Sequence, residues 1–166
     1  MQYKPVIIAI VVLSALAFVS GYISQINRHS YDIYRHIKVS NCKIAVSSCK
    51  VDLGEGSSIQ VNILPRGIPE TEMLRISVDT QDTQIEALSV IFEGIEIDTI
   101  TPEYSLYQYS DTRFIGNGSL AICSLDKMHW IAHFIVKKGG KNWKVSLPFE
   151  KNLTSQPLKT TQNIDL

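Results

Sequence analysis

The sequence predicts an all-β fold: an immunoglobulin-like antiparallel β-sandwich of about seven strands, preceded by a single N-terminal transmembrane helix. Three observations predict it. The chain opens with a long apolar run, the rest alternates between apolar and polar residues, and Gly, Pro, Asn or Asp separates most of the alternating segments. No part of the chain shows the repeated strand–helix–strand pattern that a parallel sheet requires.

The N-terminal run predicts a membrane anchor at residues 1–26. Residues 6–19 contain only one hydroxyl side chain, Ser14, and Tyr22 and Ile23 extend the apolar stretch. The resulting length of about 18 residues is near the minimum for a helix that crosses a bilayer. A cleaved signal peptide, with Ala15 and Ala17 at its small-residue site, is the alternative. Both interpretations export the rest of the chain.

The anchor is followed by a polar segment with scattered aromatic residues, residues 27–41. We expect a juxtamembrane segment there, in which Ile33, Tyr34 and Ile37 could form one short helical face. The β-sandwich domain is expected at 42–150. The polar residues 151–166 have the composition of a disordered tail.

Alternation with a period of two fixes which side chains of each strand face the core. Gly139 and Gly140 lie between the last two strands and predict a two-residue hairpin. The expected inward residues are Ile59, Val61, Ile63, Leu74, Ile76, Val78, Val90, Phe92, Tyr104, Leu106, Phe114, Leu120, Ile122, Trp130, Ala132, Phe134, Val136, Trp143, Val145, Leu147 and Phe149.

Charge and motifs exclude several functions. Lys plus Arg and Asp plus Glu each number 16, which argues against a nucleic-acid partner, because such binding needs a basic surface. The chain has no phosphate-binding glycine loop followed by Lys-Ser or Lys-Thr, and no Cys-x-x-Cys pair. The acids Glu93, Glu96 and Asp98 fit a solvated face better than an acid–base pair. We expect that the protein is not an enzyme.

Three cysteines are present, Cys42, Cys49 and Cys123. In an exported domain a disulfide is the default expectation. The candidates are a local bridge between Cys42 and Cys49 and a long-range bridge between Cys49 and Cys123. Either bridge leaves one thiol unpaired.

The segment around Cys123 predicts a candidate metal site. If Cys42 pairs with Cys49, the thiol of Cys123 is free, with Met128 and His129 close in sequence, and such soft ligands with an imidazole suit Cu(I). In the alternative, Cys123 is structural and Met128 belongs to the core, because it shares strand parity with Trp130. His129 and His133 are then surface residues about 13 Å apart along one face.

Tyrosines of the segment 104–110 are candidates for a binding surface, because tyrosine is common at protein interfaces. Tyr104 shares strand parity with Leu106 and is expected in the core. Tyr107 and Tyr109 lie on the opposite face, so we expect them to be exposed.

Several motifs resemble those of a known family. They are "CKIAVSSC", "IQVNILPRGIPETEMLRISVD", "FIGNGSLAIC" and "MHWIAHFIV", and they cover residues 40–150. This arrangement resembles the FixH and YtkA-like group of small membrane-anchored proteins, found mainly in Gram-negative bacteria. The resemblance implies an exported immunoglobulin-like sandwich and a role in the assembly of haem–copper terminal oxidases, alongside copper-insertion proteins of the Sco type. It carries over Cys123 and no catalytic residue.

One segment departs from that family. Many relatives carry a methionine-rich turn where this chain has "GIEIDTITPEY", and residues 94–104 contain no methionine or histidine. The departure favours a structural or interaction role over direct copper transport.

These observations predict a single-pass protein of the inner membrane with its C-terminal domain in the periplasm. We expect it to assist the assembly of a respiratory oxidase or another membrane complex, with the oxidase or its assembly factors as partners. The alternatives are a Cu(I) chaperone that uses Cys123 with Met128 or His129, and a structural envelope module without metal.

Overall fold

The computed structural model describes residues 12–16, 18, 32–121 and 127–152. The chain divides into two compact units, residues 1–32 and residues 33–166. In the first unit, residues 12–16 and 18 are helical. Within the described ranges, no helix has the length and apolarity needed to span a bilayer. Most of the predicted anchor at 1–26 lies outside those ranges.

The second unit is built of strands, so the all-β prediction is confirmed. The strands are β1 (Ile33–Lys38), β2 (Cys49–Gly54), β3 (Ser57–Leu64), β4 (Leu74–Thr80), β5 (Ile85–Gly94), β6 (Thr99–Ile100), β7 (Tyr104–Ser110), β8 (Arg113–Gly118), β9 (Lys127–Lys138) and β10 (Lys141–Asn152).

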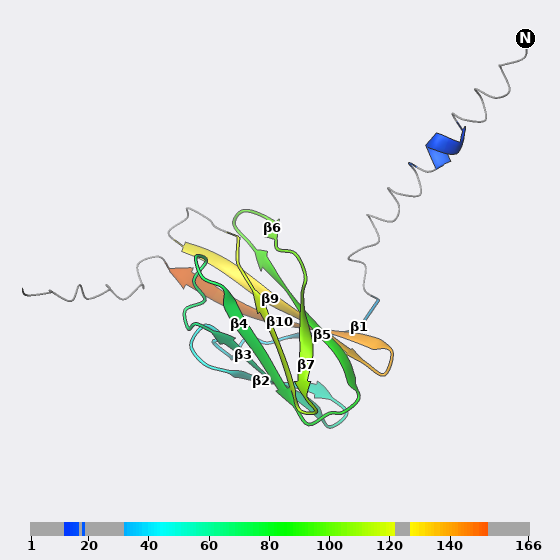
Figure 1. Ribbon diagram of the computed structural model, residues 1–166. Helices are drawn as coiled ribbons and strands as arrows, with labels where there is room; N and C mark the ends of the chain where they lie inside the picture. The colour runs from blue at the N-terminus through cyan, green and yellow to red at the C-terminus, as the bar shows by residue number, and fades with distance from the viewer. Residues whose placement is uncertain (1–11, 17, 19–31, 122–126, 153–166) are drawn as a thin grey trace, which may run out of the picture. The chain divides into compact units, whose positions relative to one another are not determined.

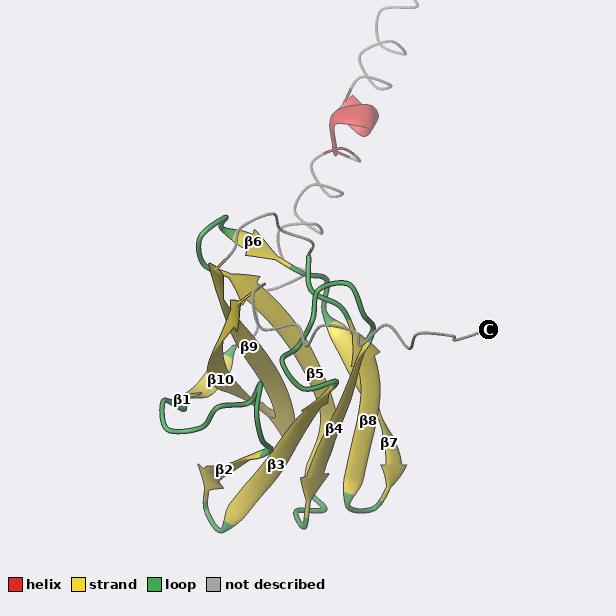
Figure 2. Ribbon diagram, turned by 90° about the vertical axis from the view of Figure 1, so that its left-hand side faces the viewer, coloured by secondary structure: helices red, strands yellow, loops and turns green. Residues whose placement is uncertain are grey.

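The strands form one continuous path in the order β1-β10-β9-β5-β7-β8-β4-β3-β2, with β6 paired to β5. Strand β7 connects two layers: Tyr104–Leu106 pairs with β5, whereas Tyr107 and the residues after it pair with β8. Figure 2 shows β3, β4 and β8 in one layer and β9, β10 and β5 in the other. The fold is therefore a sandwich that is continuous at β7 and has β1 and β2 as its open edges.

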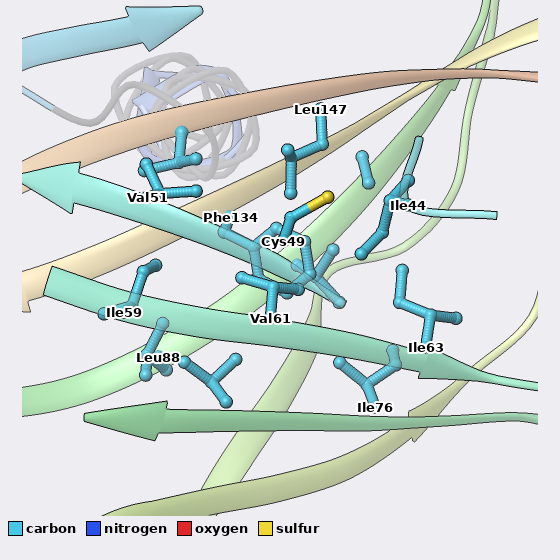
Figure 3. Close-up of a cluster of buried hydrophobic side chains, with 14 of the residues drawn as sticks. Ile44, Cys49, Val51, Ile59, Val61, Ile63, Ile76, Leu88, Phe134 and Leu147 are labelled. Carbon is cyan, nitrogen blue, oxygen red and sulfur yellow. The ribbon is translucent and has the colours of Figure 1, made fainter. Parts of the chain in front are cut away.

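The predicted alternation accounts for the core. Nearly all of the expected inward residues are buried; Tyr104 is half-buried, and Ile122 lies outside the described residues. Figure 3 shows side chains from both layers meeting, with Val61 and Ile63 of β3 facing Phe134 and Leu147 of β9 and β10. Burial of apolar surface of this kind contributes roughly 1.5–3 kcal/mol for each large side chain.

The predicted hairpin at Gly139 and Gly140 is present between β9 and β10. Both residues have positive φ angles, 53° and 73°. A two-residue loop needs this backbone conformation to match the twist of the strands, and glycine adopts it without steric cost.

The count of about seven strands was too low. The seven predicted segments correspond to β3, β4, β5, β7, β8, β9 and β10, and the structure adds β1, β2 and β6. The purely antiparallel expectation was also wrong at one place, because β1 pairs with β10 in parallel. The ladder between β1 and β10 joins residues about a hundred positions apart, and no local pattern encodes such a pairing.

Strand β1 corrects the prediction of a helical face at 27–41. The strand places Ile37 against the core, while Tyr34 packs edge-on against Trp143, with ring centroids 5.1 Å apart. The β-sheet therefore begins before the predicted boundary at residue 42. At the other end, β10 continues to Asn152, two residues into the predicted tail, and residues 153–166 lie outside the described residues.

Two buried ion pairs join the β9–β10 hairpin to loops of the other layer. Lys151 Nζ lies 2.6 Å from Glu70 Oε2, and Lys138 Nζ lies 2.7 Å from Asp82 Oδ2. Burial alone would raise the pKa of Asp82. The ion pair with Lys138 and the hydrogen bond from the backbone N–H of Gln84 outweigh burial and hold that pKa below its ordinary value.

Candidate functional site

The structure contains a disulfide between Cys42 and Cys49, the local one of the two pairings considered. Cys49 opens β2 and is fully buried among core side chains (Figure 3). Cys42 is partly buried and packs against the same core. No other cysteine of the same chain then remains to pair with Cys123. Cys123 itself lies in the segment 122–126, outside the described residues.

Met128 faces the core, as its strand parity predicted. Its side chain is only 1% exposed. It packs over Gly94 of β5, where an added Cβ atom would meet the Met128 methyl group and the ring of Trp130. The absence of a side chain at Gly94 therefore makes the space that Met128 and Trp130 fill.

His129 points away from the core, so it and Met128 lie on opposite faces of β9. Its Nδ1 atom lies 2.5 Å from Glu96 Oε1, and its backbone N–H donates to Glu96 Oε2 at 2.8 Å. Its Nε2 atom lies 3.7 Å from a carboxylate oxygen of Glu150. The hydrogen bonds from His129 lower the pKa of Glu96. The imidazole is therefore engaged by carboxylates.

The structure does not bring the two described candidate ligands together. A site in which Met128 and His129 bind the same ion would require one of them to cross the sheet. Among the described residues, no group of three or more His, Cys, Asp or Glu side chains could hold a metal ion. A site that joins Cys123 to only one of the two residues stays a prediction.

His133 lies on the same face as His129, but the expectation that it is a surface residue was wrong. It is 7% exposed, and side chains of the two strands beside β9 contact its ring. Its Nδ1 atom lies 2.8 Å from Ser146 Oγ and its Nε2 atom 2.6 Å from Glu93 Oε2. Ser146 Oγ also lies 2.7 Å from His36 Nε2.

These four residues, His36, Ser146, His133 and Glu93, form what we call the histidine chain. It runs across β1, β10, β9 and β5 on the outer face of one layer. Burial lowers the pKa of His133, and the hydrogen bond to Glu93 opposes that effect. Partial burial also lowers the pKa of His36, and the positive charges of Lys144 and Lys38 lower it further.

The contacts of Ser146 with His133 and of His133 with Glu93 resemble those of a hydrolase triad. The surroundings of Ser146, however, differ from those of a nucleophile. Ser146 is buried in the middle of β10, with β9 and β1 on its two sides. A catalytic serine of a hydrolase sits at an exposed turn, where backbone N–H groups can stabilise the oxyanion. The arrangement fits a hydrogen-bonded chain between strands.

The tyrosines of β7 follow the predicted parity. Tyr107 and Tyr109 are 61% and 68% exposed. Tyr104 is half-buried, and its hydroxyl group donates to the backbone oxygen of Ser119 at 3.1 Å. A shallow, mostly apolar hollow of about 200 Å³ lies beside Tyr107, on the outer face of β4, β8 and β7. Its lining comprises Arg75, Ile76, Ser77, Tyr107, Ile115, Gly116 and Asn117.

Comparison with known proteins adds no relative. No family model matches the chain, and neither the characterised proteins nor the solved structures include one that is significantly similar. The candidate sites therefore rest on this chain's own geometry.

The histidine chain is the feature that sequence reasoning missed. Strand parity placed His133 on the outer face, and Ser146 of β10 has the matching parity. His36 was assigned to a separate segment before the domain. An alternating pattern in residues 33–37, with Ile33 and Ile37 on one side, was the signal that could have indicated β1.

Proposed function

We propose that the protein is a membrane-anchored accessory protein of a bacterial envelope, whose β-domain binds a protein partner in the periplasm. The partner that the family resemblance favours is a respiratory oxidase or one of its assembly factors. We also propose that the two-layered domain is an immunoglobulin-like sandwich. The two packed layers and the buried tryptophans Trp130 and Trp143 support this assignment.

The observation that carries the binding role is the exposure of Tyr107 and Tyr109 on one strand, beside the hollow on β4 and β8. Large exposed aromatic side chains are uncommon on a surface that faces only water, whereas tyrosine is enriched at the centres of protein interfaces. The hollow can receive an apolar side chain, and the guanidinium of Arg75 and the amide of Asn117 can orient polar groups at its rim.

Replacement of Tyr107 and Tyr109 by serine is expected to abolish the assisting role without unfolding the domain. The test is a deletion strain complemented with each variant, in which the haem–copper oxidase content of isolated membranes is measured by difference spectroscopy. The deletion is expected to lower that content, and the wild-type chain to restore it. The double variant should restore less than about a tenth of it, since truncation of an interface hot spot costs about 2 kcal/mol or more.

The matched control is Met73→Ser, because Met73 is equally exposed, at 69%, and is not part of β7 or of the hollow. It should restore the oxidase as the wild type does. If the double tyrosine variant restores it as well, the proposed binding surface is wrong. If the deletion leaves the oxidase content unchanged, the proposed partner is wrong.

A second candidate function, a Cu(I) chaperone, is favoured by the observed disulfide. Because Cys42 and Cys49 are paired, Cys123 is the one cysteine without a partner in its own chain. A thiolate with a thioether or an imidazole is a ligand set that suits Cu(I).

Under this second hypothesis, the full-length chain in detergent should show one reactive thiol before reduction and bind one Cu(I) per chain in an anaerobic titration. Binding should be lost in Cys123→Ser. Two further variants distinguish the possible second ligands. His129→Asn should weaken binding if the imidazole is the second ligand, and Met128→Leu should weaken it if the thioether is. The chaperone hypothesis fails if Cys123→Ser binds copper as tightly as the wild type, or if the wild type binds none.

A further inference from the structure

The protons of the histidine chain have one consistent arrangement when both imidazoles are neutral. A carboxylate only accepts, so His133 Nε2–H donates to Glu93, and His133 Nδ1 is then an acceptor. The hydroxyl group of Ser146 donates to that nitrogen, and its oxygen accepts the Nε2–H of His36. The hydroxyl group of Ser146, both ring nitrogens of His133 and Nε2 of His36 thereby all have a partner.

A proton added to His36 Nδ1 leaves this order unchanged, whereas a proton added to His133 reverses it. Protonated His133 donates to Ser146 Oγ, and the hydroxyl group must then donate to His36 Nε2. A second proton has no such solution. Two imidazolium groups would both donate to Ser146, and its own hydrogen would lose both histidine acceptors.

The charges around the chain oppose the doubly protonated form. The positive charges of Lys38 on β1 and Lys144 on β10 lower the pKa of His36, and that of Lys144 also lowers the pKa of His133. Among the described residues, the carboxylate in contact with the two histidines is that of Glu93 of β5, which lies on the far side of His133 from His36. Because both atoms contact Ser146 Oγ, His36 Nε2 and His133 Nδ1 are at most about 5.5 Å apart. A positive charge on one imidazole therefore makes protonation of the other less favourable.

Strand β1 is the part of the sheet whose movement can relieve the repulsion between the two protonated histidines. It is an edge strand, and four of its six residues are exposed. Besides the ladder, it is held by the contact of Tyr34 with Trp143, by the burial of Ile37, and by a 3.3 Å hydrogen bond from Arg35 to the backbone oxygen of Leu53. Segments with few buried contacts are those that open at low free-energy cost.

We propose that the histidine chain is a proton-sensitive clasp: protonation of His36 and His133 releases β1 from β10 while the rest of the sandwich stays folded. Release would leave the backbone groups of β10 opposite β1 without a strand partner. An open strand edge of this kind can accept an extended segment of another chain. The clasp is independent of the tyrosine surface, because it lies on the other layer.

The direction of the pH dependence follows from the lowered pKa values of both histidines. In the released state the imidazole of His36 recovers its ordinary pKa of 6.5, and the pKa of His133 is no longer lowered by the charge of His36, whereas in the closed state both pKa values are lower. The clasp therefore keeps its full strength above pH 6.5 and weakens as the pH falls below it. The loss amounts to at most about tenfold in the opening equilibrium per pH unit from His36.

Residue-resolved hydrogen exchange on the full-length chain in detergent tests the clasp. The reporter is the amide of Val39, which donates to the backbone oxygen of Ser146 at 3.0 Å, and the reference is the amide of Val61 in the buried strand β3. After correction for the intrinsic exchange rate, protection of Val39 should fall by about tenfold or more between about pH 7.5 and about pH 5. Protection of Val61 should stay unchanged.

His36→Gln is the matched variant, because its carboxamide can still donate to Ser146 but does not titrate in this range. The fall at Val39 should shrink by about tenfold in that variant. The proposal is overturned if Val39 keeps its protection at low pH, if His36→Gln shows the same fall as the wild type, or if Val61 loses protection together with Val39.

Discussion

Replacement of Lys138 by methionine is expected to lower the free energy of unfolding by about 3–5 kcal/mol, because it leaves a buried carboxylate without its counter-charge. The side chains of Lys138 and Asp82 are only 8% and 14% exposed, and their charged atoms lie 2.7 Å apart. The measurement is urea denaturation of the full-length chain at neutral pH, followed by tryptophan fluorescence.

The chain offers a matched control at the neighbouring position. Lys137 pairs with Glu86 at 3.3 Å, but these side chains are 52% and 45% exposed, so Lys137→Met should change stability by less than about 1 kcal/mol. The double replacement of Lys138 by Met and Asp82 by Leu should recover most of the loss, since it removes the orphaned charge. Equal effects of the Lys137 and Lys138 replacements would contradict the prediction.

The same ion pair predicts a loss of stability in acid. The folded-state pKa of Asp82 is below its ordinary value of 3.8, so its contribution is complete above that value. It is lost as the pH falls below 3.8 and through the lower folded-state pKa. This acid-dependent part should be absent in the double replacement, which has no carboxylate at position 82.

Replacement of Trp130 by alanine is expected to cost about 3–5 kcal/mol of unfolding free energy, because it opens a large cavity in a core that cannot collapse around it. Trp130 is fully buried on β9 and lies opposite Gly94 of β5. Gly94 has no side chain that could move into the space left by the Trp130 ring. The residues around the cavity can therefore close only a small part of it. Thermal unfolding monitored by circular dichroism measures the loss.

The control for the tryptophan prediction is Tyr109→Ala, an aromatic truncation at a position that is 68% exposed. It should change stability by less than about 0.5 kcal/mol. Trp130→Phe should lose less than Trp130→Ala, since the ring of phenylalanine still fills part of the space. Similar losses for the Trp130 and Tyr109 truncations would show that Trp130 is not in the core.

Local patterns predicted most of the sheet. The alternation in 59–63, 74–78 and 130–136 identified side chains that are all buried, because the period of two is fixed by the strand backbone itself. The same parity placed Met128 inward and Tyr107 outward. Parity separates the faces of a strand, but it does not tell how deeply the outer face is covered. For this reason the burial of His133 was missed.

The missing strand β1 has the same kind of cause. Five of its six residues pair with β10 across a separation of about a hundred residues, and most of the side chains of β1 are exposed. Such a strand buries little apolar surface, so its sequence carries only a weak alternation. What holds it is the unpaired edge of β10, which exists only once the rest of the sheet has formed.

By itself, the sequence determined the all-β class, the inward residues of seven strands, the glycine hairpin and the two possible disulfide pairings, because each of these depends on neighbours along the chain. The tertiary structure alone decided that Cys49 pairs with Cys42 and not with Cys123, that His133 is buried, and that His36 meets His133 across Ser146. The burial of His133 and its link to His36 depend on the strand order and register, which no local pattern specifies.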